Sequence, residues 1–96
     1  MAEMWDAYDR QFNKIENVIL KREKAVPDGM YHLVCEIIVK HNDGTYLLMQ
    51  RDFEKHLGGM WELTAGGSAL KGETPMECAV RELREETGIV SCNLQE

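Results

Sequence analysis

Residues 67–89 constrain the fold of this chain more than any other segment, because they encode a helix together with both of its ends. Thr74 is suited to cap the start of a helix, and Glu77, three residues later, completes a capping box. Gly88 can adopt the left-handed conformation that ends a helix. The sequence therefore predicts a helix of about four turns that runs from Thr74 to Thr87.

The predicted helix has an apolar face and an acidic face. At about 100° per residue, the apolar side chains fall together; they are Met76, Ala79, Val80, Leu83 and Thr87. The glutamates gather about a third of a turn away; they are Glu82, Glu85 and Glu86. In an isolated helix, such glutamates more often form a solvated face that pairs with Arg81 and Arg84.

Two features favour a metal site over a solvated face. Glu82 and Glu86 are like charges four residues apart, and Glu86 also lies near the negative end of the helix dipole, so a cation would compensate both costs. The pairs Gly66-Gly67 and Gly72-Glu73 indicate a close approach of the backbone just before the helix. We therefore predict that Mg²⁺ or Mn²⁺ binds the glutamates, with a main-chain carbonyl near Gly66 as a further ligand.

The same residues fit one continuous pattern: glycine, five residues, glutamate, seven residues, then Arg-Glu-aliphatic-any-Glu-Glu-any-Gly-aliphatic. At ordinary residue frequencies, a chain this short matches it by chance roughly once in a hundred million. The pattern resembles the motif of the Nudix hydrolases. These enzymes use divalent metal to cleave a diphosphate within a nucleoside diphosphate that is joined to a further group.

The resemblance implies a role for each matching residue. Glu82, Glu85 and Glu86 match the metal-binding glutamates, with Glu82 and Glu86 as direct ligands, and Arg81 matches the arginine that orients them. Three other motif positions are implied to be structural: Gly67, Glu73 and Gly88. The implied cofactor is Mg²⁺ or Mn²⁺, which lowers the pKa of a water for attack on phosphorus. The general base stays open between one of these glutamates and a residue beyond the motif.

Segments upstream of the motif resemble the Nudix branch related to isopentenyl-diphosphate isomerase, including WDAYD near the start, YHLV from Tyr31, LLMQR up to Arg51 and GGMWELTAGGSALKGE before the helix. That branch is expected to have a cysteine and a histidine where this chain has Gly66 and Ser68, so hydrolysis is favoured over isomerisation. His32 falls where the branch has a histidine near the metal. His32 and Arg51 are therefore candidates for substrate binding, although a lone histidine is more often a structural strand residue.

Upstream of the helix, the residue pattern predicts strands. Two hairpins are expected, from residues 5–8 with 15–21 and from residues 31–40 with 45–51, the second around the turn at 42–44. A loop at 52–60 and a short strand at 61–65 then lead to the glycine loop. The predicted class is α+β, a Nudix-type mixed β-sheet packed against the motif helix. Three side chains are expected to pack in the core or the loop rather than on a base: Phe53, His56 and Trp61.

The chain has 96 residues, which we interpret as a single Nudix domain over residues 1–96. Only residues 90–96 follow the motif, whereas a Nudix domain normally continues for several tens of residues. We therefore expect the N-terminal part of a domain, incomplete at its C-terminus, with an exposed apolar sheet face that favours self-association. A catalytically incomplete binding or interaction module is the alternative to an active hydrolase.

Composition narrows the expected partners and location. A net charge of −6, without a cluster of Lys and Arg, disfavours nucleic-acid binding. No apolar run approaches the ~20 residues of a membrane span, and the N-terminus lacks the pattern of a secretory signal. The three cysteines, Cys35, Cys78 and Cys92, are widely spaced, which suits a reducing cytoplasm, and we predict that Cys35 and Cys78 are buried as small apolar residues. The expected partner is a small-molecule nucleoside diphosphate derivative.

Overall fold

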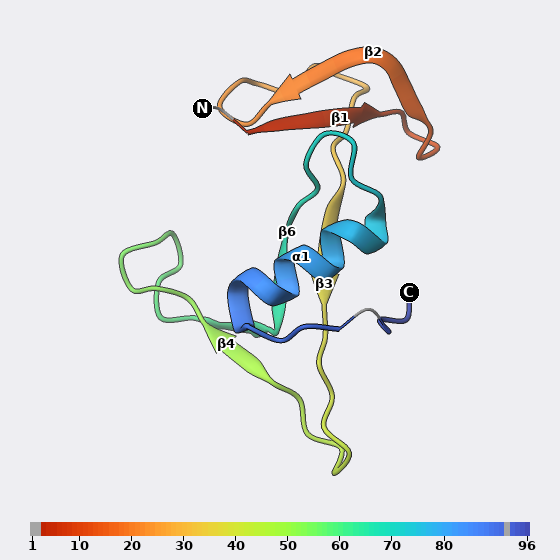
Figure 1. Cartoon of the computed structure of the whole chain (residues 1–96). Helices are drawn as coiled ribbons and strands as arrows, with labels where there is room; N and C mark the ends of the chain where they lie inside the picture. The colour runs from red at the N-terminus through yellow and green to blue at the C-terminus, as the bar shows by residue number, and fades with distance from the viewer. Residues whose placement is uncertain (1–2, 92) are drawn as a thin grey trace.

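The computed structural model describes residues 3–91 and 93–96. These residues form six strands and one helix: β1 (Met4–Tyr8), β2 (Lys14–Lys21), β3 (Val34–Ile37), β4 (Leu48–Gln50), β5 (Trp61–Leu63), β6 (Ala65–Ser68) and α1 (Pro75–Thr87). Within the described residues, the strands pair as three antiparallel ladders, β1 with β2, β3 with β6, and β4 with β5. Figure 1 shows α1 packed across β3 and β6 in the middle of the molecule. The predicted α+β class is confirmed, with the sheet divided into these three ladders.

The helix α1 begins and ends where the sequence predicts. The hydroxyl of Thr74 accepts a hydrogen bond from the Glu77 N–H at 3.1 Å, and the Thr74 N–H donates to Glu77 Oε1 at 3.0 Å. Pro75 occupies the first turn, where its missing N–H is not needed. At the other end, Gly88 has φ 81° and its N–H donates to the carbonyl of Arg84 at 2.8 Å. Both ends therefore depend on contacts over three or four residues.

The buried face of α1 differs from the predicted apolar face at its first turn. Leu83 is buried against Ile37 of β3 and Ala65 of β6, and Cys78 is fully buried, as predicted. Met76 remains exposed, so its prediction as a core residue is wrong. The reason is that the first turn of α1 borders an open pocket beside β3, where no strand in the described part of the chain covers it.

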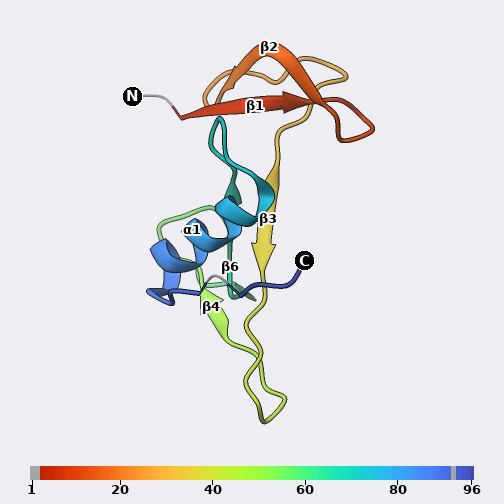
Figure 2. The same ribbon diagram turned by 45° about the vertical axis from the view of Figure 1, so that its right-hand side comes forward.

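The predicted N-terminal hairpin is confirmed as β1 and β2, and it lies at one end of the molecule (Figures 1 and 2). Its core is formed by Trp5, Ala7 and Leu20. The indole of Trp5 also stacks on the ring of His32, with centroids 3.8 Å apart. The hairpin is thus a small core of its own, joined to the rest of the chain through a few contacts at its edge.

The second predicted hairpin forms only near its turn, where a bridge and two main-chain hydrogen bonds connect its arms. Farther from the turn the arms separate, because β3 pairs with β6 and β4 pairs with β5. The buried Thr64 holds this branch point, since its Oγ1 donates to the carbonyl of Leu47 at 2.7 Å and accepts from the N–H of Val39 at 2.9 Å. The strand predicted at 61–65 is consequently divided into β5 and β6, and Gly66-Gly67 lies in a strand rather than in a loop.

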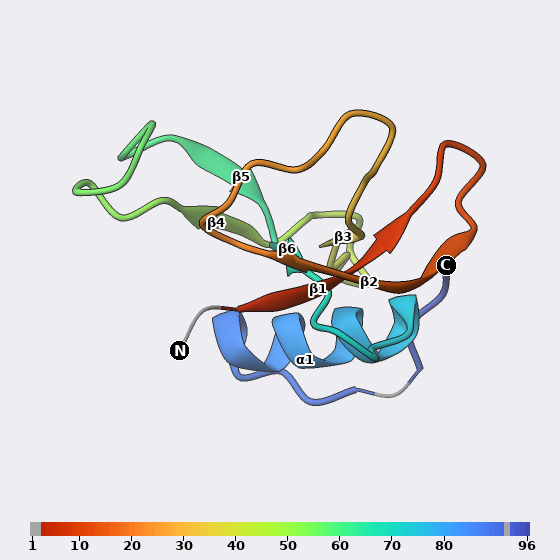
Figure 3. The ribbon, with the colours of Figure 1, turned by 90° about the horizontal axis from the view of Figure 1, so that it is seen from above.

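Several large apolar side chains on the strands remain exposed: Val34, Leu48, Trp61 and Leu63. Core packing is therefore wrong for both Trp61 and Phe53, which are 63% and 76% exposed, although the ring of Phe53 lies beside Gly59 of its own loop. Figure 3 shows that β4 and β5 project from the side of the molecule away from α1. Self-association through such a surface stays a prediction. Within the described residues, no helix has the length and apolarity that a membrane span requires.

Candidate metal centre

Arg81, in the middle of α1, connects three of the motif glutamates. Its Nε and Nη2 donate to the two carboxylate oxygens of Glu73 at 2.6 and 2.9 Å. Its Nη1 donates to Glu82 Oε1 at 2.7 Å and to Glu85 Oε2 at 3.1 Å. Nη2 also donates to the carbonyl of Ser68 at 3.1 Å, which ties the helix to the end of β6. Because the side chains of Arg81, Glu73 and Glu82 are all less than a fifth exposed, the pairs of Arg81 with Glu73 and Glu82 are less screened by water than ordinary surface ion pairs, whereas Glu85 is exposed.

The two hydrogen bonds between Arg81 and Glu73 favour the charged form of both side chains. The Arg81 guanidinium lowers the pKa of Glu73, and Glu73 in turn raises the pKa of Arg81. Burial opposes each shift, while the N–H of Leu70, which donates to Glu73 Oε1 at 2.8 Å, adds to the first. Glu73 thus joins the loop before α1 to the middle of the helix as an ionised carboxylate.

Glu86, one turn beyond Glu82, is held in a different way. Its Oε2 accepts a hydrogen bond from the N–H of Gly66 at 3.2 Å. Burial raises the pKa of Glu86, and the negative charges of Glu82 and Glu62 raise it further, whereas Gly66 and Lys55 act in the opposite direction. The protein therefore disfavours the negative charge of Glu86, and a cation beside it would reverse that balance.

Gly67 leaves room for the carboxylate of Glu82. A Cβ built on Gly67 would lie 2.5 Å from Cδ of Glu82 and 2.6 and 2.7 Å from its two oxygens, closer than real contacts allow. Any other residue at this position would displace the carboxylate. The carbonyl of Gly67 also accepts a weak hydrogen bond from Cys78 Sγ at 3.7 Å. Burial raises the pKa of Cys78 to about 12, so this thiol packs as a neutral group below β6.

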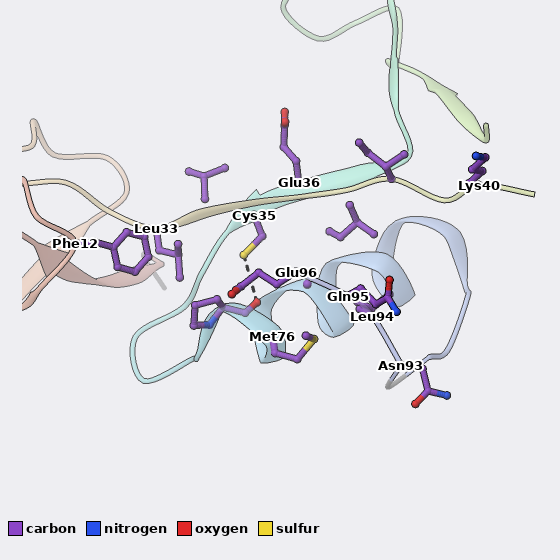
Figure 4. Close-up of a pocket in the computed structure, with 15 residues that line it drawn as sticks. Phe12, Leu33, Cys35, Glu36, Lys40, Met76, Asn93, Leu94, Gln95 and Glu96 are labelled. Atoms are coloured by element: carbon purple, nitrogen blue, oxygen red, sulfur yellow. Dashed lines mark hydrogen bonds between the residues drawn. The ribbon is translucent and has the colours of Figure 1, made fainter. Parts of the chain in front are cut away.

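A pocket of about 760 Å³ lies between β3, the start of α1 and the C-terminal residues (Figure 4). Cys35 points toward α1, where its Sγ donates to the carbonyl of Pro75 at 3.4 Å, and Glu36 points to the other side of β3. Cys35 is half-buried, less than predicted. The described residues that line the pocket include none of the motif glutamates. This pocket and the acidic helix face are therefore separate features.

The two candidates for substrate binding lie in different parts of the fold. His32 stacks on Trp5 of the N-terminal hairpin, and its buried Nδ1 has no hydrogen-bond partner among the described residues. Arg51 follows β4, and its Nε donates to the carbonyl of His56 at 2.9 Å while its Nη1 lies 3.4 Å from Glu62 Oε2. The structure thus places His32 in a packing contact and Arg51 in a charged group that includes Glu62.

The charges of Glu62 and Lys55 shift the pKa of Glu86 in opposite directions, and neither residue was predicted from the sequence to belong to the site. Glu62 lies in β5 between Trp61 and Leu63, and a charge between apolar residues marks the polar face of a strand. That pattern was the only local signal for Glu62, and Lys55 lies in a loop without one. Their effect on Glu86 depends on where the tertiary structure places β5 and the loop before it relative to the end of α1, which no local pattern encodes.

Within residues 3–91 and 93–96, no group of three or more His, Cys, Asp or Glu side chains is already arranged around a metal position. The structure turns one oxygen each of Glu82 and Glu85 toward Arg81, and turns Glu86 toward Gly66. The donor set still fits a hard divalent cation, because it offers carboxylate oxygens on one helix face beside a backbone strand. The raised pKa of Glu86 fits the same ion, since it marks a charge that the surrounding residues do not balance.

Comparison with known proteins identifies the family. A family model described as NUDIX domain matches residues 30–96. The chain belongs to the Nudix family. An uncharacterized Nudix hydrolase of Listeria monocytogenes is 36% identical over 89 residues, which cover 92% of this Nudix chain and 52% of the relative. An 8-oxo-dGTP diphosphatase of Proteus vulgaris is 41% identical over 59 residues, with 60% and 50% covered.

The predicted resemblance to the isomerase branch is also confirmed. An isopentenyl-diphosphate Delta-isomerase of Corynebacterium diphtheriae is 30% identical over 80 residues, which cover 82% of this Nudix chain and 44% of the relative. The chain spans about half the length of the curated relatives that it matches. No solved structure matches it.

Proposed function

We propose that this Nudix chain carries the metal centre of an enzyme that hydrolyses the diphosphate bond of a nucleoside diphosphate linked to another group. The observation that carries the proposal is the Arg81 network, which holds one oxygen each of Glu82 and Glu85 on the face of α1 that also bears Glu86. Carboxylates on one helix face that a neighbouring arginine orients supply part of the ligand set that a divalent-metal hydrolase requires. The membership of the Nudix family supports the same reaction class.

The proposed ligands of Mg²⁺ or Mn²⁺ are Glu82, Glu85 and Glu86, with the main chain of Gly66 beside them. Arg81 donates to Oε1 of Glu82 and to Oε2 of Glu85, so the second oxygen of each carboxylate would be available to the metal. The chemistry that the metal supplies when bound is neutralisation of the diphosphate and a lower pKa for an attacking water. The residues of the chain would bind the metal, orient the carboxylates and balance the charge of the site.

The relatives support a nucleotide substrate, since one of them is named for the hydrolysis of 8-oxo-dGTP. ADP-ribose is a second member of the proposed class. Isomerisation of isopentenyl diphosphate is less well supported, because position 66 carries no thiol and Cys35, which pairs with Gly67 in the ladder, directs its Sγ to the carbonyl of Pro75. Isopentenyl diphosphate is therefore included as a competing substrate in the test.

The test is product release from a panel that contains ADP-ribose, nucleotide sugars, dinucleoside polyphosphates, 8-oxo-dGTP, other nucleoside triphosphates and isopentenyl diphosphate. Each substrate is incubated with Mg²⁺, with EDTA, and with the Glu86→Gln variant. Glu36→Gln is the matched control, because Glu36 is an exposed carboxylate on the other side of β3.

We expect release that needs the metal, fails in Glu86→Gln and persists in Glu36→Gln. Equal release with EDTA or with Glu86→Gln would contradict the proposed mechanism. If nothing is released although Mn²⁺ raises the Tm of the wild type, the metal site is supported but turnover by this chain is contradicted. The alternative of a catalytically incomplete binding module is then favoured.

A further inference from the structure

The N-terminal hairpin holds the loop that leads into α1. The N–H of Gly72 donates to Asp6 Oδ2 at 2.7 Å, and the N–H of Lys71 donates to the carbonyl of Met4 at 2.9 Å. Both acceptors belong to β1, which lies outside the residues 30–96 that the Nudix family model matches. Part of this chain beyond the family match therefore fixes the motif loop directly.

Asp6 is well placed to hold that loop. Its side chain is only 12% exposed, and Oδ2 also lies 3.3 Å from the Nζ of Lys14 on β2. The hydrogen bond from Gly72 is the main cause that lowers the pKa of Asp6, so the carboxylate is ionised and its bonds are charge-assisted. Gly72 has φ 86°, a conformation that side chains disfavour, and Asp6 receives the N–H that this turn presents.

A short chain of contacts connects this anchor with the acidic face. Gly72 is followed directly by Glu73, whose two oxygens receive the Nε and Nη2 of Arg81. Arg81 then donates to Glu82 and Glu85 from its Nη1. A shift of the loop at Gly72 would therefore move the carboxylate that orients Arg81.

We propose that Asp6 is a positioning residue of the metal centre. It fixes the Gly72-Glu73 turn from the N-terminal hairpin, so that Glu73 holds Arg81 in the orientation that Glu82 and Glu85 require. The importance for catalysis rests on the proposed function, whereas the control of Arg81 by Asp6 rests on the hydrogen bonds alone.

The test compares Asp6→Asn with Asp9→Asn. Asparagine keeps the size of the side chain but removes the charge that strengthens the bond to Gly72. Asp9 is the matched control, because its carboxylate accepts from the N–H groups of Gln11 and Asn13 at 2.9 Å each, all within the turn of the same hairpin. A merely structural role in the hairpin would lower the Tm of both variants in a similar way.

Two signals report without any metal on the bond between Gly72 and Asp6 and on the bond between Arg81 and Glu73. These are hydrogen exchange of the Gly72 amide and of the Arg81 Nε–H, both measured by NMR. In Asp6→Asn we expect both to exchange about fivefold faster than in the wild type, with no change in Asp9→Asn. With Mn²⁺ followed by EPR, we expect the Kd to rise by about fivefold in Asp6→Asn alone.

Unchanged hydrogen exchange at Gly72 and Arg81 in Asp6→Asn would overturn the inference, regardless of the Kd for Mn²⁺. If the wild type binds no Mn²⁺ but the exchange rates respond as expected, the proposed function fails and the positioning of Arg81 stands. If Asp6→Asn does not fold, Asp6→Glu decides the question, because it keeps the charge but displaces the carboxylate by one methylene. Faster exchange in Asp6→Glu supports the inference, and unchanged exchange overturns it.

Discussion

Glu73 lies in the loop before α1 and Glu86 lies in the last turn of α1, and the protein shifts the pKa values of these two carboxylates in opposite directions. Arg81 donates two hydrogen bonds to the carboxylate of Glu73 and lowers the pKa of Glu73. Glu86 receives a backbone N–H from Gly66, and burial together with nearby negative charge raises its pKa. The charge of Glu73 is balanced by Arg81 of the same chain, whereas Glu86 carries a charge that a cation would balance.

The largest expected effect follows from removing the guanidinium. In Arg81→Met, the partly buried carboxylates of Glu73 and Glu82 lose their common partner, so the free energy of unfolding should fall by about 3–5 kcal/mol. Arg84→Met is the control, because Arg84 is an exposed arginine of the same helix and should change stability by about 0.5 kcal/mol or less. Urea unfolding measures both, and equal losses would mean that the network adds no stability.

The second effect appears at the other end of the face. Glu86→Gln should leave the metal-free free energy of unfolding unchanged or slightly higher, because the folded state disfavours the charge of Glu86. Mn²⁺ at a hundred times its Kd should stabilise the wild type by about 2.7 kcal/mol, and this gain should disappear in the variant. Thermal unfolding with and without Mn²⁺ measures both quantities. If Glu86→Gln lowered the metal-free free energy of unfolding as much as Arg81→Met, the contrast between Glu73 and Glu86 would be contradicted.

The third effect is a pH dependence set by Glu73. Because its folded pKa lies below the ordinary value of 4.5, its contribution to stability is present above that value and is lost as the pH falls through the folded pKa. Glu73→Gln should therefore lower the free energy of unfolding by about 1.5–3 kcal/mol at pH 7 and should flatten its decline in acid. Denaturant unfolding from pH 7 down to pH 3 tests this, and a variant that keeps the full decline would show that another group causes it.

The smallest effect concerns the space that Gly67 leaves for Glu82. Gly67→Ala would push the carboxylate of Glu82 aside, at a cost of about 1 kcal/mol in stability because the end of that side chain can move. Affinity for Mn²⁺ should fall by a larger factor than stability suggests, because the displaced group is a proposed ligand. Ser68→Ala is the control, since it keeps the carbonyl that Arg81 contacts. Calorimetric titration with Mn²⁺ compares the two variants, and equal affinities would argue against Glu82 as a ligand.

Short-range patterns predicted the helix and the N-terminal hairpin correctly. The cap at Thr74 and the end at Gly88 depend on hydrogen bonds between residues three or four apart, which the sequence displays directly. The branch at Thr64 was not predictable in that way, because strand partners are chosen by contacts between distant segments. The position of Glu62 relative to Glu86 follows from the same choice.

The sequence by itself determined which side chains share the acidic face of α1, because a period of 3.6 residues per turn places Glu82, Glu85 and Glu86 together. Only the tertiary structure decided how each charge is balanced. Asp6 meets Gly72 across 66 positions of the chain, and Gly66 reaches Glu86 across 20. Such contacts form when separate elements pack, so the electrostatic state of each glutamate is a property of the folded chain.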